Sequence, residues 1–543
     1  MDVSYDAVVI GAGHNGLTCA CYLAKVGLKV LVLEEYHTIG GMTITEEITL
    51  PGFKSDVHAF GYQLANFSPV PKELNLYRYG FELIKPEISY SHIFPNGGYI
   101  SMYREIGKTM KSIEKYSKRD AVTWNKMFNT FLKNKDAIIE SINSSPRLLS
   151  SKLKYMENES KYKHDYNNIE IDTYKFDIQS MRSWANEWFE SEESKVMFGT
   201  FSAFVGLGPD DAGGGGLSYL FANCIQDGGN NVVKGGFINL PIALSKFIKS
   251  HGGQILTNSS VKKIIVRNGK AIGVRLENGK EIGVKKIIAS STDPFTLVVK
   301  HLGEENVEKR ILQKVKGIEW GDAIFAIYLA LNNPIKFKNN SEILSLSSQI
   351  HFSPPEIDYL SKIFSECRSG KIPTNPLAIM SNDSLMDPSR VPNNKHLLKF
   401  LILSVPYDIK EIISDNKSKV EFLTTKLEWN QVKDNFSDTI ISSIDKDYIP
   451  NLREEILKIT SYSPKDFENK PSTCIKGTIA CGAVLPYQRG AMRPIQELSN
   501  YRIPSISNLY LCGSGCHPGP GVSMAPGRNA AMNIIDDLHL KMD

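Results

Sequence analysis

The sequence predicts an α/β fold of at least two domains, one of them assembled from separated segments of the chain. The chain has 543 residues, more than a single hydrophobic core usually serves. Residues 5–35 read as strand, Gly-rich turn, helix and strand, the pattern of a βαβ unit. Strand patterns return at residues 228–292, and a strand, a Gly-rich loop and a helix occupy residues 509–537. The first domain is therefore expected to resume twice along the chain.

The composition excludes several classes of protein. Apolar residues make up 42% of the chain and charged residues 22%, as in ordinary globular proteins. The net charge of +4 is small, so no nucleic-acid partner is expected. The 8 cysteines form no CxxC pair and are expected to be free thiols, and no residues show metal-ligand spacing. Because the sequence shows neither a signal peptide nor an apolar run of roughly 20 residues, we expect a cytoplasmic protein without a transmembrane segment.

The first βαβ unit carries a dinucleotide-binding motif. Gly11, Gly13 and Gly16 form a Gly-x-Gly-x-x-Gly turn between a strand and a helix expected over residues 15–26. Such a turn lets the backbone approach a pyrophosphate at the positive end of the helix. Glu34 ends the next strand, at the distance where an acid accepts hydrogen bonds from an adenosine ribose. This context disfavours the alternative, a Gly-rich turn that only packs a helix.

Further features distinguish FAD from NAD, which the first turn and the acid would also accept. Gly40 and Gly41 follow the acid closely and allow the chain to pass a second time against the pyrophosphate of a longer ligand. Val261 lies in a strand pattern whose backbone can pair with an adenine edge, although a plain core valine fits equally well. No strand precedes residues 213–216, so this glycine run is interpreted as a loop and no second nucleotide-binding domain is expected.

The C-terminal Gly-rich segment is the second candidate for contact with the cofactor. A strand leads into Gly513, and the loop ends in a helix with Pro526 in its first turn. Backbone amides and a positive helix end therefore meet at one place. The amides near Val522, Ser523 and Met524 are expected to stabilise negative charge on a flavin that accepts hydride.

Two histidines lie in these Gly-rich segments. His517 is a weak candidate for catalysis, because a histidine in a Gly-Pro loop more often braces the backbone. His14 lies inside the first turn and is interpreted as a surface or backbone-bonded residue. The sequence therefore assigns a catalytic role to no residue, and the flavin is the only redox centre that it predicts.

These segments together resemble the phytoene desaturase-related flavoproteins. The resemblance rests on residues 11–17 (GAGHNGL), 40–41 followed by 45–47, 234–236, and 513–531 (GSGCHPGPGVSMAPGRNAA). The chain is most similar to the branch that holds β-carotene ketolase-like proteins and animal pyridine nucleotide-disulfide oxidoreductase domain-containing proteins. It departs from these relatives at Pro526, where they usually carry a small residue other than proline.

The resemblance implies the domain organisation and the cofactor contacts. We expect a Rossmann-type FAD-binding domain assembled from discontinuous segments, residues 1–75, 228–300 and 475–543. Residues 76–227 and 301–474 are then expected to form an α+β substrate domain with an antiparallel sheet and a helical cap. The motif match places these residues at FAD-contacting positions, with residues 522–524 beside the flavin: Gly11, Gly13, Gly16, Glu34, Gly41, Val261 and Gly513.

A helical pattern between residues 104 and 165 is expected to form the cap. Apolar side chains recur there at helical spacing: Trp124, Met127, Phe128, Phe131 and Leu132. Lys and Arg outnumber Asp and Glu by 14 to 8 in this segment, so peripheral contact with an anionic membrane is one expectation, and a solvated helical face is the favoured one. The second lobe is expected to contain strands at 323–331 and 397–405 and a helix from about 417 to 445.

The expected function is that of an FAD-dependent oxidoreductase. The resemblance suggests hydride transfer from a long apolar substrate, an isoprenoid or a polyene such as a carotenoid. Desaturases, isomerases and oxygenase-like enzymes all belong to this expectation. The alternatives are an amine-oxidase-like flavoenzyme that acts on a polar amine and a low-turnover flavoprotein that acts through a partner or a lipid.

Overall fold

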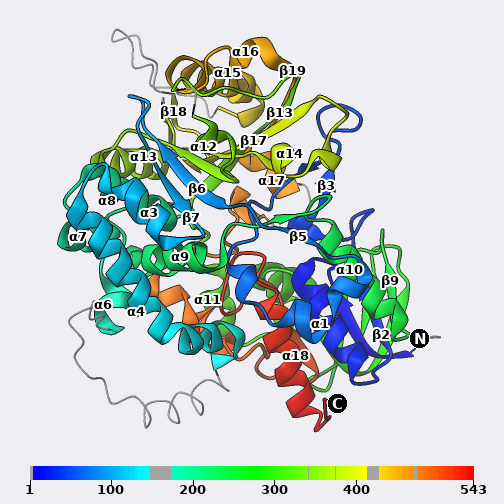
Figure 1. Cartoon of the computed structure of the whole chain (residues 1–543). Helices are drawn as coiled ribbons and strands as arrows, with labels where there is room; N and C mark the ends of the chain where they lie inside the picture. The colour runs from blue at the N-terminus through cyan, green and yellow to red at the C-terminus, as the bar shows by residue number, and fades with distance from the viewer. Residues whose placement is uncertain are drawn as a thin grey trace.

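The computed structural model describes residues 4–146, 173–339, 341–373, 375–412, 427–469 and 474–542. In this part of the chain two large sheets lie in two lobes (Figure 1). The lower lobe in Figure 1 combines blue, green and red segments, which come from the beginning, the middle and the end of the chain. The predicted discontinuous α/β domain is therefore confirmed.

The first sheet contains seven strands in the order β10-β11-β12-β1-β2-β9, with β20 beside β12. Their bounds are β1 Ser4–Ile10, β2 Val30–Leu33, β9 Gln254–Leu256, β10 Val261–Arg267, β11 Lys270–Leu276, β12 Glu281–Ser290 and β20 Leu509–Leu511. Strand β1 pairs in parallel with β2 and β12, and β12 pairs in parallel with β20. The β10-β11-β12 meander is antiparallel, and Asn268 and Gly269 form its first turn with positive φ angles, as the Asn-Gly pair predicts.

Three helices cover this sheet. Helix α1 (His14–Lys25) packs against α10 (Asn239–Ser250) and α18 (Ala525–Asp537), and its bounds confirm the predicted helix within one residue. A Cβ atom at Gly527 would lie 2.1 Å from the backbone oxygen of Asn15. Because glycine has no such atom, α18 can lie directly against the start of α1.

The second sheet also contains seven strands, in the order β19-β13-β17-β16-β14-β6-β7. Their bounds are β6 Ile88–Ile93, β7 Tyr99–Tyr103, β13 Ala323–Leu331, β14 Gln349–Phe352, β16 Ala378–Ser381, β17 His396–Val405 and β19 Ile456–Tyr462. All neighbours pair antiparallel except β14 and β6, which are parallel. Strand β13, second from one edge, is buried along its whole length because both faces of the sheet are covered.

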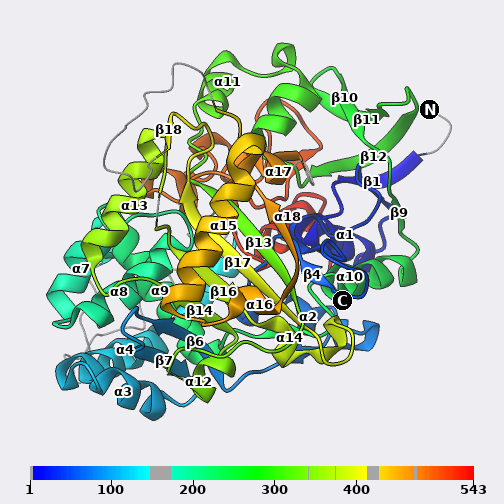
Figure 2. The ribbon, with the colours of Figure 1, turned by 90° about the horizontal axis from the view of Figure 1, so that it is seen from above.

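Different helices cover the two faces of the second sheet. Helix α15 (Trp429–Asp447) lies across β13 and β17 in Figure 2 and packs Trp429 and Phe436 against Phe325. The opposite face meets α4 (Lys118–Asn143), α7 (Met181–Trp188), α8 (Glu192–Ala203) and α9 (Gly214–Gly228) in one aromatic-rich core. The remaining helices are α2 Val70–Glu73, α3 Ile106–Glu114, α6 Thr173–Ile178, α11 Lys309–Lys316, α12 Glu342–Ser345, α13 Ile357–Ser369, α14 Asp383–Met386, α16 Leu452–Glu455 and α17 Pro464–Asn469.

Short strand pairs connect the segments between the sheets. They join β3 (Thr45–Glu46) to β4 (Ser55–Asp56), β5 (Leu83–Ile84) to β8 (Val232–Val233), and β15 (Lys371–Ile372) to β18 (Glu411–Ile412). The β5-β8 pair joins the region just after the first predicted FAD segment to the start of the second one.

The predicted cap is helical in the part that the structure describes. Helices α3 and α4 are separated at Ser117, whose side chain accepts a hydrogen bond from the backbone N–H of Asp120 and so caps α4. Of the predicted apolar stripe, Trp124, Met127, Phe128 and Phe131 are buried, but Leu132 is 42% exposed. The predicted helix is present, and Leu132 lies at the edge of its packed face. Residues 147–165 of the predicted cap lie outside the described residues.

The helix expected from about residue 417 starts later in the structure. Helix α15 begins at Trp429 and not near residue 417, because Leu427 forms a bridge with Ile409 and Glu428 caps the helix together with Gln431. Residues 413–426 lie outside the described residues.

The glycine run at residues 213–216 is the start of α9 and not a loop. A Cβ atom at Gly215 would lie 2.4 Å from the Trp184 ring, and one at Gly216 would lie 2.2 Å from the backbone oxygen of Phe176. The glycines are therefore required by helix packing, which a sequence pattern does not reveal.

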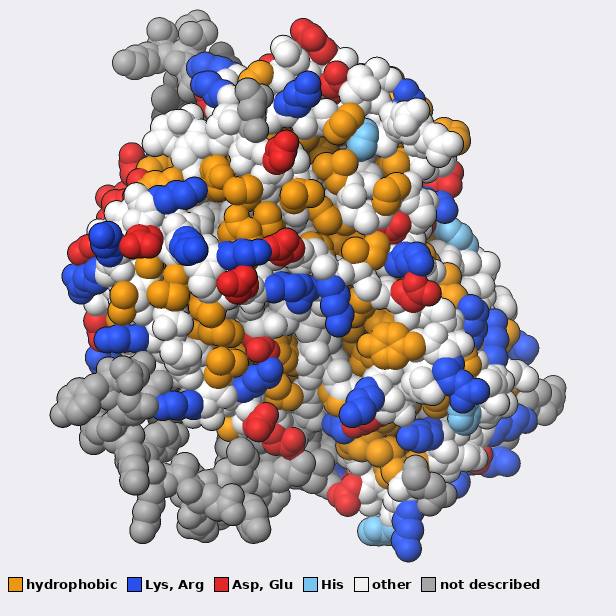
Figure 3. Space-filling model, in the orientation of Figure 1, with side chains coloured by type: hydrophobic (Ala, Val, Ile, Leu, Met, Phe, Trp, Pro, Cys, Tyr) orange, Lys and Arg blue, Asp and Glu red, His pale blue; other side chains and the backbone are white. Residues whose placement is uncertain are grey.

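Charges of both signs are interspersed over the face of the molecule in Figure 3, in agreement with the small net charge. Among the described residues, no helix combines the length and the apolar character needed to cross a membrane.

Candidate cofactor and substrate site

The first Gly-rich turn is packed so closely that only glycine fits at two of its positions. A Cβ atom at Gly11 would lie 2.4 Å from Ser291 Oγ, and one at Gly16 would lie 2.1 Å from the backbone oxygen of Gly11. Gly11 also has a φ of 92°, which favours glycine. The turn therefore brings the start of α1 directly to the end of β1 and leaves the helix N-terminus open to a ligand.

The second glycine pair lies against the first turn. The backbone N–H of Gly40 donates to the oxygen of Ala12 at 2.9 Å, and Gly13 and Gly40 form a parallel bridge. A Cβ atom at Gly41 would lie 3.1 Å from the Cα atom of Gly13. The close second pass of the chain that the sequence predicts is thus present in the fold.

These turns form one wall of a groove with roughly 940 Å³ of space free of protein atoms, its open mouth included. Five predicted cofactor residues line it together: Gly11, Gly13, Glu34, Gly41 and Val261. Gly16 and Gly40 do not line it and lie within the packed turns. Sequence reasoning missed other lining residues: His14, Asn15, Met42, Ser259, Ser260, Ser291, Thr292, Asp293, His301, Cys481 and Ser514.

Glu34 is buried at the edge of the groove and already accepts two backbone hydrogen bonds. Its Oε2 accepts from the N–H of Ala12 at 2.6 Å, and its Oε1 accepts from the N–H of Tyr36 at 2.9 Å. Burial raises the pKa of Glu34, and these two hydrogen bonds act in the opposite direction. Each carboxylate oxygen keeps a further lone pair, so Glu34 can accept from a ribose while it holds the turn.

Replacing Glu34 with Gln should weaken FAD binding by roughly 1.5 to 3 kcal/mol, because charge-assisted hydrogen bonds to the ribose are lost. Titration of the flavin-free variant with FAD measures this change. Since Glu34 also holds the turn, thermal unfolding of the flavin-free variant provides the control for a loss of structure. FAD affinity equal to that of the parent protein would contradict the assignment of the ribose contact.

The C-terminal segment approaches the groove at Ser514. A Cβ atom at Gly513 would lie 2.4 Å from the backbone oxygen of Ser291, so Gly513 packs β20 and its loop against the groove wall. Val522, Ser523 and Met524 do not line the groove, and Met524 takes a left-handed φ of 62° before α18. Their contact with the flavin stays a prediction.

Pro526 occupies the first turn of α18, as expected. Its missing N–H has no role at that helical position. The departure from the relatives at this residue therefore leaves the helix intact.

His517 braces the C-terminal loop. Its Nε2 lies 2.7 Å from the backbone oxygen of Ser141, which can only accept, so Nε2 is the donor. The hydroxyl of Tyr501 in turn donates to the backbone oxygen of His517. His517 is not among the groove-lining residues. The geometry favours the bracing role that the sequence suggested.

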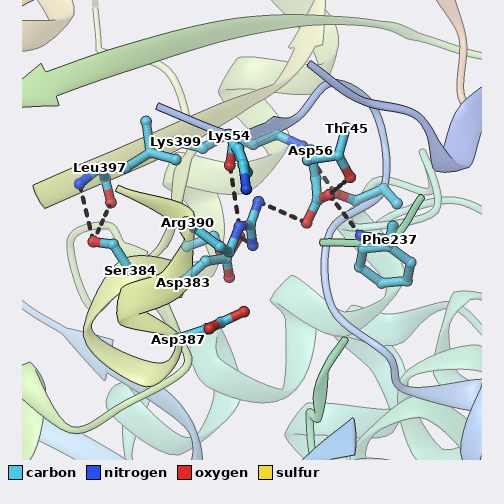
Figure 4. A network of polar contacts seen from close by, with 12 residues as sticks. Thr45, Lys54, Asp56, Phe237, Asp383, Ser384, Asp387, Arg390, Leu397 and Lys399 are labelled. Carbon is cyan, nitrogen blue, oxygen red and sulfur yellow. Dashed lines mark hydrogen bonds and ion pairs between the residues drawn. The ribbon is translucent and has the colours of Figure 1, made fainter. Parts of the chain in front are cut away.

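A buried ion network anchors the chain after Gly41 to the second sheet (Figure 4). The guanidinium of Arg390 pairs with Asp56 at 2.9 Å and with Asp383 at 2.8 Å. Nearby, Lys399 on β17 donates to the backbone oxygens of His58 and Ala59. Burial lowers the pKa of Lys399 to about 8. The network thus fixes the path of residues 54–59 between the two lobes.

FAD fits the residues that form the groove. Glycine at positions 11, 16 and 41 lets the turns pack against each other and against Ser291, which places the start of α1 at the groove where a pyrophosphate would bind. The fold and this groove define an FAD-dependent oxidoreductase. The family described as flavin containing amine oxidoreductase matches residues 16–421, and the chain belongs to this family.

Curated relatives match nearly the whole chain. One of the subunits of limonene dehydrogenase from Castellaniella defragrans is 26% identical and covers 99% of this chain and 95% of its own length. Pyridine nucleotide-disulfide oxidoreductase domain-containing protein 2 of Rattus norvegicus is 26% identical, over 98% and 94%. Phytoene desaturase of Fusarium fujikuroi is 24% identical, over 99% and 91%. The predicted resemblance to phytoene desaturase-related flavoproteins is confirmed.

Solved structures share the fold. An oxidoreductase from Methanosarcina mazei has a TM-score of 0.58 at 16% identity and covers 98% of this chain and 99% of its own. Putrescine oxidase bound to putrescine has a TM-score of 0.57 at 13% identity and covers 99% of each chain. These likenesses, at low identity, show the fold alone.

Proposed function

We propose that this chain oxidises a long apolar substrate, an isoprenoid or polyene hydrocarbon, by hydride transfer from a carbon–hydrogen bond. The observation that carries the proposal is the apolar lining of a small cavity on the helical-cap face of the second sheet, which at about 10 Å³ has room for one water molecule. Apolar residues dominate its lining, among them Phe204, Val205, Ile324, Leu403 and Ile479. An apolar lining favours an apolar substrate because it offers few hydrogen bonds to a polar one.

The cavity adjoins the cofactor groove. Ala480 lines the cavity and the next residue, Cys481, lines the groove. A substrate that widened this cavity on binding would therefore lie close to one end of the bound cofactor. The names of two relatives, limonene dehydrogenase and phytoene desaturase, refer to isoprenoid hydrocarbons, which supports the same substrate class.

When bound, FAD supplies the hydride acceptor. The chain's own residues bind and orient the reactants and exclude water. Hydride loss from an allylic carbon leaves a cation that conjugation delocalises, and loss of one proton to a base then completes the new double bond. The cavity lining includes neither histidine nor lysine but does include the Asp322 carboxyl group.

Amine oxidation is the second candidate, and one observation favours it. Asp322 lines the cavity, and its Oδ2 has no hydrogen-bond partner in the described structure. However, Arg368 lies 3.5 Å from the other carboxylate oxygen and offsets part of its charge, although the same guanidinium also donates to both carboxylate oxygens of Asp211. An ammonium group would prefer a carboxylate without a neighbouring guanidinium. The apolar substrate is therefore the better supported of the two.

Anaerobic reduction of the bound flavin tests the proposal. The holoenzyme is mixed with a linear polyene or a cyclic terpene in detergent micelles, or with an aliphatic diamine, and the flavin absorbance is followed. Bleaching by the hydrocarbon alone supports the proposal, and bleaching by the diamine alone overturns it in favour of amine oxidation. If photoreduction bleaches the flavin but neither substrate class does, the protein is a low-turnover flavoprotein and the proposal also fails.

Replacing His517 with Asn should lower kcat by less than roughly a hundredfold, the lower end of general acid-base contributions. The reason is that the His517 ring braces the Ser141 backbone and carries no proton to a substrate. Steady-state kinetics at equal flavin content measure the change. Replacement with Gln is the control, because its amide can reach the position of Nε2. A several-thousandfold loss with an unchanged flavin spectrum would show proton transfer by His517 instead.

A further inference from the structure

The start of α1 carries two buried polar side chains that face the cofactor groove. His14 and Asn15 are only 8% and 5% exposed, and both line the groove. Neither ring nitrogen of His14 has a well-formed hydrogen bond in the described structure, and neither does Oδ1 of Asn15. Buried polar atoms without partners are unfavourable, so a ligand in the groove is the natural source of the missing hydrogen bonds.

Another buried histidine of this chain shows the usual arrangement. Nδ1 of His92 lies 3.1 Å from the Tyr90 hydroxyl, and Nε2 lies 2.8 Å from Ser353 Oγ. His92 is thus satisfied within the protein core, whereas His14 is not. Of the two interpretations given for His14, a surface position is wrong because the ring is buried at the groove, whereas contact with the backbone agrees with Gly521 beside the ring.

The chemistry of the ring limits what the ligand can offer. Burial lowers the pKa of His14 to about 4, so the ring is neutral near pH 7 and has one donor and one acceptor. The Gly521 backbone lies beside the ring and raises this pKa, as a carbonyl oxygen facing a ring N–H does. The other ring nitrogen and Asn15 Oδ1 are then acceptors. Their partner in the ligand must therefore donate a hydrogen bond. A hydroxyl group can donate one, whereas a pyrophosphate oxygen near pH 7 carries no proton and cannot.

FAD has two sugar-like parts, the ribityl chain and the adenosine ribose. The position of Gly521 favours the ribityl chain as the partner of His14. Gly521 belongs to the C-terminal segment predicted to lie at the flavin end, whereas Glu34 is the predicted partner of the adenosine ribose. We propose that His14 and Asn15 accept hydrogen bonds from the ribityl hydroxyls of FAD. These contacts bind the flavin half of the cofactor and not its ADP half. The inference uses the FAD site alone and does not depend on the proposed substrate.

The test compares two ligands with one variant. In flavin-stripped protein that regains full flavin content with FAD, His14→Leu should weaken FAD binding by roughly five- to fiftyfold. The same change should alter the dissociation constant of ADP, which lacks the ribityl chain, by less than about twofold. Titration calorimetry with FAD and with ADP gives both values without any measurement of turnover. His14→Gln, which keeps a side-chain acceptor, should regain part of the FAD affinity.

His92→Leu is the matched control for loss of a buried histidine. It should lower the thermal stability of the flavin-free protein and leave the ratio of FAD to ADP affinity unchanged. Equal weakening of FAD and ADP by His14→Leu would overturn the proposal and place the ring on the pyrophosphate or in the packing of the turn. Unchanged FAD affinity would overturn it as well. If His14→Leu does not fold, the same comparison of FAD with ADP in Asn15→Ala decides between these outcomes.

Discussion

Replacing Gly16 with Ala should leave a protein that is purified with little or no flavin. The added Cβ atom would lie 2.1 Å from the backbone oxygen of Gly11 and 2.8 Å from Ser291 Oγ, so α1 must move away from the turn. Overpacking of this kind typically costs about 1–3 kcal/mol, which corresponds to FAD binding weakened by roughly 5- to 150-fold. The flavin-to-protein absorbance ratio after purification and an FAD titration measure the effect.

Gly107 in helix α3 provides the matched control. A Cβ atom added at Gly107 would lie 3.6 Å from its nearest neighbour, an oxygen of the flexible Glu105 side chain. The φ angle of Gly107 is not positive. Gly107→Ala should therefore leave flavin content unchanged and stabilise the helix slightly. Full flavin content in Gly16→Ala would show that the turn tolerates a side chain and would contradict its role as the pyrophosphate cradle.

Local patterns in the sequence predict the first lobe well. The strand before Gly11, helix α1 and the Asn-Gly turn at residues 268–269 are each determined by residues close together in the chain. The antiparallel second sheet was expected from the family resemblance alone. Its strand β13 is buried on both faces and therefore shows no alternation that would reveal its neighbours.

The residues of the site likewise fall into two groups, those that a local motif predicts and those whose roles depend on distant segments. Gly11, Gly13, Glu34 and Gly41 were predicted because a motif with fixed spacing carries them. The roles of His14 and Arg390 could not be predicted, because burial and partners decide them and both depend on segments far apart in the chain. Arg390 and Asp56, for example, are far apart in the sequence, and only the tertiary fold brings them within 2.9 Å. Charged residues with distant partners leave no periodic signal.

The Arg390 network is nearly cut off from water. The Arg390 and Asp56 side chains are 1% and 3% exposed, and Arg390 also donates to the backbone oxygen of Lys54. Asp56 in turn accepts from the hydroxyl of Thr45 and from the N–H of Phe237 (Figure 4). One guanidinium therefore balances buried carboxylates from both lobes. Removing it leaves Lys399, which interacts with both Asp56 and Asp383, as the nearby cation.

Replacing Arg390 with Met should lower the free energy of unfolding by about 3–5 kcal/mol, the usual cost of breaking a buried ion pair from one side. Denaturant unfolding of the flavin-free protein measures the loss. Burial already raises the pKa of Asp56 against the opposing effect of Arg390, so the variant should raise it further. Because the protonated carboxyl carries no charge, the deficit should shrink as the pH falls through this raised pKa.

Two further variants show whether the lost charge balance causes the effect. Adding Asp56→Asn to Arg390→Met should recover part of the stability, since one of the buried carboxylate charges is removed. Arg275→Met breaks the exposed pair with Glu281 and should cost no more than about 1 kcal/mol. A loss in Arg390→Met as small as that in Arg275→Met would mean that water reaches the network. The buried ion pairs would then not be what holds residues 54–59 against the second sheet.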